Sequence, residues 1–178
     1  VYLIKNMKNK FFFFFIILSL FFCFAVLYKG LNNSKKYIPG VENQKTLPIF
    51  ITKNFFSNKE INSEKIFNDN NFYILNIWSS WCVPCRKEHA ILMELSKNKS
   101  VKLIGLNYRD NLTNAKKFIE ELGNPYDEIL IDENGTLAVE FGAYGVPETF
   151  IIKKKKIIKK FIGPLNKGLL QEIKLILK

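Results

Sequence analysis

Apolar and polar positions fall into blocks along this chain, and the blocks differ in kind. Residues 11–28 form one uncharged apolar run, long enough for a helix that spans a membrane. Residues 29–46 are polar, contain Gly and Pro and show no sustained period, so we expect a tether there. The sequence therefore predicts one folded domain at residues 47–178, behind an amino-terminal membrane segment.

Within residues 47–178, short apolar runs alternate with helical patterns. The run FYILNIW at 72–78 lacks alternation, which predicts a central strand covered on both faces. A helix with an apolar face follows it, up to about residue 98. The elements expected after that are a strand at 101–107, a helix closed by Gly123, a strand at 128–132, a helical turn at 137–141, an antiparallel hairpin at 148–163 and an amphipathic helix at 166–178.

This order of elements predicts the fold class. Strands that alternate with helices pair in parallel through right-handed crossovers, and the late hairpin adds antiparallel strands. We expect an α/β domain with a mixed central sheet flanked by helices, preceded by one transmembrane helix and without internal repeats.

The charge adds little to this picture. The formal net charge is +11, but Lys, Asn, Ile and Phe are abundant throughout, as a composition bias would produce. We therefore expect no nucleic-acid partner. The dense basic run at 153–156 lies between two apolar runs and is interpreted as a solvated hairpin turn.

The apolar run at 11–28 is interpreted as an uncleaved signal anchor, because a small-x-small cleavage site is missing near its end. Residues 1–10 are then expected in the cytoplasm, whether translation starts at Val1 or at Met7. Basic residues flank both ends, so the charge rule for orientation is weak here. Cys23 is interpreted as a buried small apolar residue.

Cys82 and Cys85 carry the clearest chemical signal, in the stretch NIWSSWCVPCRKEH. A zinc site needs further Cys or His ligands, and the chain offers only Cys23 and His89. Covalent haem attachment needs His after the second cysteine, where this chain has Arg86. A structural disulfide across so short a loop would constrain the unfolded chain little. Thiol–disulfide exchange remains.

The position of the pair assigns a role to each sulfur. The cysteines follow a buried strand, and Pro84 suits the first turn of the helix that comes next. Cys82 would then lie at a helix amino terminus, where free amides and the helix dipole stabilise a thiolate. We expect Cys82 to attack substrate, Cys85 to resolve the mixed disulfide, and no bound cofactor besides this redox-active pair.

The same stretches resemble a known family. WCVPC after LNIW, together with GVPETF at 145–150, resembles the thioredoxin superfamily. GLNYRDN at 105–111, ELGNPY at 121–126 and GAYGVPETFII at 142–152 are similar to the membrane-anchored thiol:disulfide interchange proteins of cytochrome c maturation, the DsbE or CcmG type. The resemblance covers about residues 45–178.

The resemblance implies a substrate site around the cysteines. Val146-Pro147 should be a cis peptide that faces the pair, with the Val146 backbone pairing to an extended substrate segment; Pro tolerates the cis bond and has no amide hydrogen in the way. Trp81 should shield the sulfurs at the rim. The residues expected to contact substrate are Trp81, Val83, Pro84, Val146, Pro147 and Glu148.

Two carboxylates are candidates for proton transfer. Glu88 lies three residues after Cys85, on the same helix face, and Glu148 follows the predicted cis-proline and is expected nearby. A solvated position is the ordinary alternative for either side chain. Thioredoxins carry a buried Asp where this chain has Asn76, and an amide cannot take a proton, so Glu88 is the better candidate for the base. His89 should point about 100° away around the helix.

Together with the anchor, the resemblance implies a protein-disulfide reductase in the bacterial inner membrane, with its domain in the periplasm. The implied partners are apocytochrome c or cytochrome c maturation proteins, with a membrane electron carrier as reductant. A general extracytoplasmic thioredoxin of the TlpA or ResA type is the first alternative. A membrane-tethered copper-binding assembly factor is the second, although His89 is the only histidine it could use.

Overall fold

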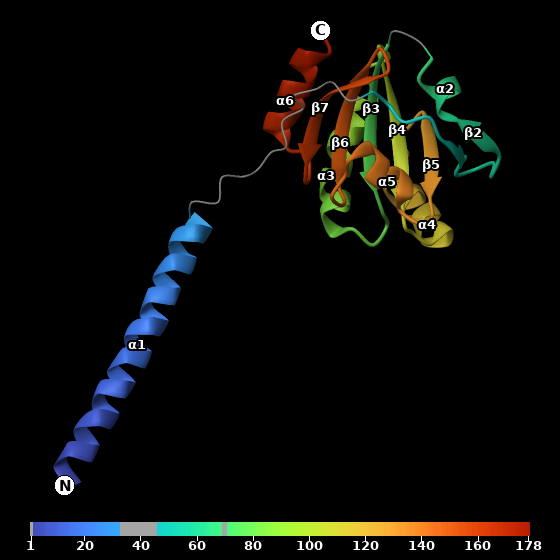
Figure 1. The fold of residues 1–178 in the computed structure, drawn as a ribbon. Helices are drawn as coiled ribbons and strands as arrows, with labels where there is room; N and C mark the ends of the chain where they lie inside the picture. The colour runs from blue at the N-terminus through green and yellow to red at the C-terminus, as the bar shows by residue number, and fades with distance from the viewer. Residues whose placement is uncertain (1, 33–45, 69–70) are drawn as a thin grey trace. The chain divides into compact units, whose positions relative to one another are not determined.

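The computed structural model of the protein describes residues 2–32, 46–68 and 71–178 (Figure 1). The chain divides into two compact units, residues 1–40 and 41–178. The first contains the helix α1 (Tyr2–Asn32), and the second contains all other elements. The predicted tether begins inside α1, since the helix continues to Asn32, and residues 33–45 of that tether lie outside the described residues.

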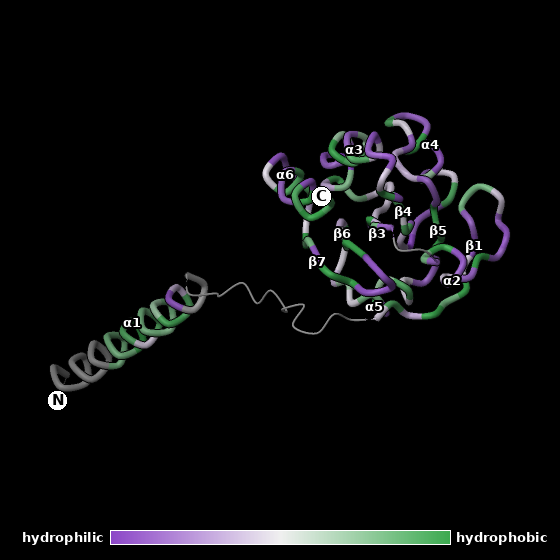
Figure 2. Tube along the Cα trace, turned by 90° about the horizontal axis from the view of Figure 1, so that it is seen from above, coloured by the Kyte–Doolittle hydropathy of each residue, from purple (hydrophilic) through white to green (hydrophobic). Residues whose placement is uncertain are grey.

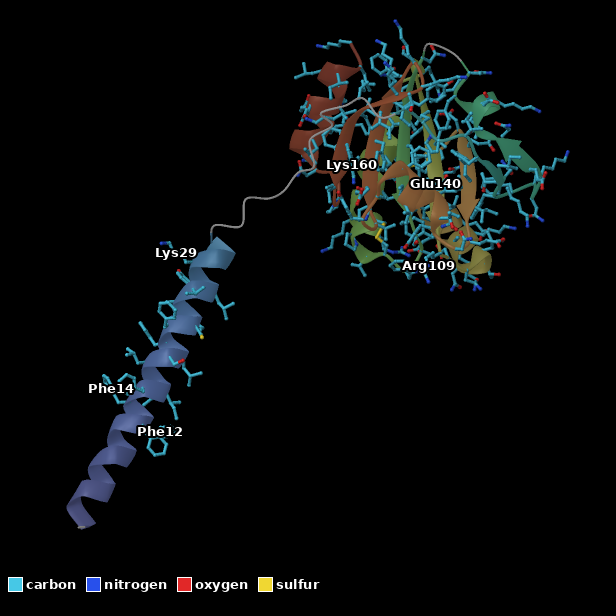
Figure 3. All side chains as sticks on the ribbon, in the orientation of Figure 1. Phe12, Phe14, Lys29, Arg109, Glu140 and Lys160 are labelled. Atoms are coloured by element: carbon cyan, nitrogen blue, oxygen red, sulfur yellow. A yellow bond between two sulfur atoms is a disulfide. The ribbon has the colours of Figure 1, made fainter. Side chains whose placement is uncertain are left out.

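Helix α1 is apolar on all sides over much of its length. The window Phe12–Lys29 is long and apolar enough to cross a membrane, and its side chains are exposed along the helix. The side chains of Phe12 and Phe14 stand out from the helix, and both are largely exposed (Figure 3). In water such a surface would be costly, and α1 is therefore a candidate membrane span.

The second unit is built on a five-stranded mixed sheet in the order β5-β4-β3-β6-β7. The central strand β3 pairs in parallel with β4 and antiparallel with β6. At the edges, β5 pairs in parallel with β4, and β7 pairs antiparallel with β6. Their bounds are β3 Phe72–Trp78, β4 Val101–Tyr108, β5 Glu128–Asp132, β6 Glu148–Lys153 and β7 Lys156–Ile162. This confirms the predicted α/β class and the central position of residues 72–78.

Helices cover both faces of the sheet, as Figure 2 shows from above. Strand alternation sends Ile74 and Trp78 to one face, where they pack under α3, α4 and α6, and sends Leu75 and Ile77 to the other, under α5. The bounds of these helices are α3 Val83–Leu95, α4 Leu112–Leu122, α5 Thr136–Phe141 and α6 Lys167–Ile176. Each corresponds to a helix or helical turn that the sequence predicts.

One part of the fold has no counterpart among the predicted elements. Residues 51–66 form a hairpin of β1 (Ile51–Lys53) and β2 (Glu60–Asn62), followed by the short helix α2 (Ser63–Ile66). Strands of three residues are too short to show a period. The hairpin lies along β5, where Asn54 forms an isolated bridge with Leu130.

Candidate active site

Cys82 and Cys85 form a disulfide at the start of α3, immediately after the central strand. Cys82 is the N-cap residue, and its Sγ accepts a hydrogen bond from the amide of Cys85 at 3.1 Å. The same amide and the positive end of the helix dipole would stabilise a Cys82 thiolate after reduction. Both cysteines are buried, with 4% of Cys82 and 2% of Cys85 exposed.

The segment before Cys82 is held by the segment after β4. The carboxylate of Asp110 accepts hydrogen bonds from the amide of Ser80 at 2.5 Å and from its hydroxyl at 2.7 Å. The indole nitrogen of Trp81 donates to the Arg109 carbonyl at 3.1 Å. Trp81 stays 57% exposed, so its ring lies at the rim beside the disulfide.

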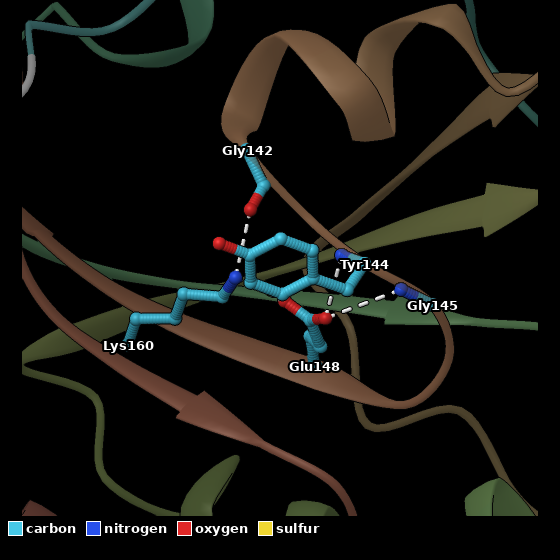
Figure 4. Close-up of polar contacts among 5 residues, drawn as sticks. All are labelled: Gly142, Tyr144, Gly145, Glu148 and Lys160. Atoms are coloured by element: carbon cyan, nitrogen blue, oxygen red, sulfur yellow. Dashed lines mark hydrogen bonds and ion pairs between the residues drawn. The ribbon is translucent and has the colours of Figure 1, made fainter. Parts of the chain in front are cut away.

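The loop that carries Val146 and Pro147 is held by hydrogen bonds to the side chain of Glu148. The Val146-Pro147 bond is cis, as the family resemblance implied, and Val146 packs against the apolar cluster that contains both cysteines. The buried carboxylate of Glu148 accepts hydrogen bonds from the amides of Tyr144 at 2.7 Å and Gly145 at 3.2 Å (Figure 4).

Lys160 of β7 completes this arrangement. Its Nζ lies 2.8 Å from Oε2 of Glu148, donates to the Gly142 carbonyl at 2.7 Å and lies 4.0 Å from the centre of the Tyr144 ring (Figure 4). One ammonium group thus neutralises the buried carboxylate and holds both the start and the middle of the loop. Tyr144 itself remains exposed.

Glu88 is fully buried one helical turn after Cys85. Its Oε1 accepts a hydrogen bond from Nδ2 of Asn76 at 2.9 Å, and its Oε2 accepts one from the amide of Leu165 at 2.7 Å. Burial raises the pKa of Glu88 to about 7, although these two hydrogen bonds act in the opposite direction. A carboxylate of this kind exchanges its proton near neutral pH.

His89 faces a different neighbour. Its Nε2 lies 2.9 Å from the Gly123 carbonyl, and its ring packs edge-on against Phe118 of α4. Burial lowers the pKa of His89, so the neutral ring, with a proton on Nε2 for Gly123, is favoured. The position agrees with the prediction that His89 points away from the sulfurs.

Comparison with known proteins identifies this arrangement. Residues 44–174, most of the folded unit, match the model of the Redoxin family. The chain belongs to the Redoxin family. Its cysteine pair lies on a thioredoxin-like fold.

Curated redoxin relatives narrow the assignment. The chain is 35% identical over 170 residues to the probable thiol:disulfide interchange protein DsbE-2 of Pasteurella multocida, covering 95% of this chain and 88% of that protein. It is 39% identical to the thiol:disulfide interchange protein DsbE of Vibrio cholerae, over 72% of this chain and 69% of that protein. This redoxin is therefore of the DsbE type, and its activity is protein-disulfide oxidoreduction.

Solved structures agree on the fold. A putative DsbE from Chlorobium tepidum superposes with a TM-score of 0.65 at 20% identity, covering 77% of this chain and 99% of that one. StoA from Bacillus subtilis superposes with a TM-score of 0.56 at 29% identity, covering 70% of this chain and 95% of that one. Both confirm the thioredoxin-like domain predicted for the carboxyl-terminal part of this redoxin.

The structure separates the two candidate carboxylates, which the sequence expected to lie close together. Asn76 pairs with Thr149 across β3 and β6, and Nδ2 of Asn76 donates to both Glu88 and Thr149. Glu148 precedes Thr149 on the strand, so its side chain points to the opposite face. The expectation that Glu148 lies near Glu88 is therefore wrong. The Glu148 carboxylate accepts hydrogen bonds from amides of the cis-proline loop. The predicted contact between Glu148 and substrate therefore has no support.

The remaining predicted residues lie at the start of α3 and on the cis-proline loop. Val83 and Pro84 are exposed on the first turn of α3, beside the cysteines in the chain, and Val146 is partly buried. Pro147 is buried at the cis bond. Their contact with substrate stays a prediction.

Sequence reasoning did not assign roles to three side chains that shape the site: Asp110, Tyr126 and Lys160. The first two lie in the stretches GLNYRDN and ELGNPY, whose resemblance to the family does not by itself assign a role to each residue. Lys160 lies among other lysines of a hairpin, and no local pattern distinguishes it from them.

Proposed function

We propose that this chain is a single-pass protein of the bacterial inner membrane whose domain works in the periplasm. There it would reduce disulfides of apocytochrome c or of cytochrome c maturation proteins. The carrying observation is the match to the DsbE-2 protein of Pasteurella multocida. The match covers 95% of this chain, and the part left uncovered is much shorter than the 31 residues of α1. Most of the apolar helix is therefore part of the sequence that the two proteins share.

The site supports the chemistry of reduction. The Cys82 thiolate attacks a substrate disulfide, forms a mixed disulfide and releases the first substrate sulfur as a thiolate. Cys85 then loses its proton and attacks the Sγ of Cys82. The second substrate sulfur leaves with the electron pair, and the Cys82–Cys85 disulfide remains. Two electrons have passed to the substrate, and a membrane electron carrier would restore the dithiol.

Glu88 is the proposed base for the second step. It is buried on the same face of α3 as Cys85 and one turn further along the helix. Its raised pKa, about 7, allows it to hold the proton of Cys85 without requiring strongly alkaline conditions. A Glu88 carboxylate also disfavours a thiolate nearby, and this favours a reductant over a strong oxidant.

A trapping experiment tests the substrate assignment. The variant Cys85→Ser attacks but cannot resolve, so membranes that express it should accumulate mixed disulfides through Cys82. We expect non-reducing gels and mass spectrometry to identify an apocytochrome or a maturation protein. Cys82→Ser is the matched control and should trap much less. A broad sample of extracytoplasmic proteins would instead support the general thioredoxin of the TlpA or ResA type.

The copper-binding alternative gains no support from the site. Its additional ligand would have to be His89, whose Nε2 is engaged with the Gly123 carbonyl. A copper titration followed by absorbance tests it directly. Tight stoichiometric binding that survives substitution of His89 but is lost with either cysteine would support copper binding by the pair alone.

A further inference from the structure

A hydrogen-bonded chain runs from Glu88 away from the cysteines. Nδ2 of Asn76 donates to Glu88 and, at 3.0 Å, to Oγ1 of Thr149. On the other side of the same amide, the hydroxyl of Tyr126 donates to Oδ1 of Asn76 at 2.8 Å. All four side chains are buried. With its carbonyl occupied by the phenol, Asn76 presents its NH2 group to Glu88.

The ring of Tyr126 is held in place by its packing. It stacks on Trp78, with ring centres 5.8 Å apart and an angle of 16° between the planes. On β4, Gly105 makes room for both rings, since a Cβ there would lie 3.0 Å from the Tyr126 ring and 2.9 Å from Nε1 of Trp78. The phenol therefore has little freedom to leave Asn76.

We infer that Tyr126 is a positioning residue for the resolving step: its hydroxyl holds the Asn76 amide with NH2 toward Glu88, and so keeps Glu88 able to accept the proton of Cys85. This inference rests on the proposed role of Glu88 as the base. Tyr126 touches neither sulfur in this scheme and acts only through Asn76.

The electrostatics of the chain agree with this geometry. The Glu88 carboxylate meets the neutral amide of Asn76 on β3 and the amide of Leu165 before α6, and its own helix carries Cys82, Cys85 and His89. Outside α3, the titratable Tyr126 is linked to Glu88 through Asn76. Burial, and then the charge of Glu88, raise the pKa of Tyr126, which keeps the phenol neutral and able to donate.

Removal of the phenol hydroxyl should weaken Glu88 as a carboxylate. In Tyr126→Phe, the buried Oδ1 of Asn76 loses its donor, and the amide gains by turning Oδ1 toward a protonated Glu88. The proton on Glu88 is then held more tightly. Loss of one hydrogen bond to a charged group corresponds to an upward shift of about one pH unit.

The shift can be measured without turnover. The full-length oxidised protein, in detergent and with 13C-labelled glutamate, would be titrated by NMR, with Glu88→Gln to assign the carboxyl signal. We expect the Glu88 midpoint to rise by about one unit in Tyr126→Phe. The pH profile of the resolving step, followed by stopped flow with a disulfide-bonded C-x-x-C-H peptide, should move in the same direction. Tyr73→Phe, the same change on the opposite face of the sheet, should move neither.

The outcomes separate this inference from the proposal beneath it. If Glu88→Gln changes the pH profile and Tyr126→Phe shifts neither midpoint nor profile, Tyr126 has no positioning role and Glu88 keeps its own. If Glu88→Gln leaves the profile unchanged, both ideas fall. Thr149→Val removes the other hydrogen bond of the Asn76 amide but leaves Tyr126 in place, and it gives a second test should Tyr126→Phe not fold. With the phenol still bound to Oδ1 the Glu88 midpoint should stay unchanged, and a rise of about one unit would show that Thr149, and not Tyr126, holds the amide.

Discussion

The Nζ of Lys160 and the carboxylate of Glu148 form a nearly buried ion pair at 2.8 Å, directly beneath the cis-proline loop. The pair joins β7 to the start of β6, and the same ammonium group also binds the Gly142 carbonyl. Burial makes each charge depend on the other, because an unpaired charge in the interior is costly.

Lys160→Met should therefore destabilise the domain by about 3 kcal/mol, since it leaves the Glu148 carboxylate buried without a cation. Chemical denaturation of the full-length protein in detergent measures this. Lys159→Met is a matched control on the same strand, because the side chains of Lys159 and its partner Glu172 are 45% and 42% exposed. That change should cost no more than about 0.5 kcal/mol. Equal losses in the two variants would contradict a special role for Lys160.

Glu88 should make the oxidised protein less stable as the pH rises. Its pKa is raised from 4.5 to about 7 in the folded state, so its stabilising effect is complete below 4.5 and is lost as the pH rises through 7. The loss is on the order of 3 kcal/mol. Glu88→Gln should remove this part of the pH dependence of the free energy of unfolding, whatever its effect on absolute stability. A slope between pH 4.5 and 7 identical to that of the original protein would contradict a buried, titrating Glu88.

His89 should contribute in the opposite direction. Burial lowers its folded-state pKa from 6.5, so the unfolded chain takes up a proton that the native ring does not, and stability is lost as the pH falls below 6.5. His89→Gln can still donate to the Gly123 carbonyl but cannot titrate, and it should reduce the acid loss. Disulfide exchange at neutral pH should stay unchanged, and a large fall in its rate would show that His89 reaches the reaction after all.

Asp110 should connect stability with reactivity. Besides Ser80, its carboxylate accepts from Nδ2 of Asn107 at 3.0 Å and from the amide of Asn111 at 2.8 Å. Asp110→Asn turns an NH2 group toward these donors and should cost about 2 kcal/mol of stability. The segment that carries Trp81 is also released, so the rate of the first exchange step should fall. A variant with lower stability but the original rate would limit Asp110 to a structural role.

The outline of this fold could be predicted because its strongest signals are local. The run at 72–78 is apolar except for Asn76 and does not alternate, as expected of a strand covered on both faces, and Asn111 and Gly123 mark the ends of α4 as cap residues do. The hairpin at 51–62 carries no such signal, since three residues hold no period and its place is decided by contacts with β5.

The chemistry of the site was predictable to the same extent. The cysteines, Pro147 and Glu88 follow from spacing and from family resemblance. The partners of Glu88 come from Asn76, 12 residues earlier, and Leu165, 77 residues later, a separation that no local pattern reveals. The error about Glu148 has a simple cause: proximity along the chain says nothing about faces, and on a strand one residue decides which side of the sheet a group occupies.

Because Cys82 is only slightly exposed, the shape of a substrate decides whether its disulfide can reach the Cys82 sulfur. Only 4% of the residue is open to solvent, beside a projecting indole. Attack on a disulfide requires three sulfurs in line, so an incoming bond must be presented at the tip of a narrow, pliable peptide. A compact protein that keeps its cystines within its own surface cannot meet this requirement, whatever its redox potential. Discrimination would then act on conformation more than on amino-acid identity, and folded proteins would exchange disulfides with Cys82 more slowly than unfolded chains would.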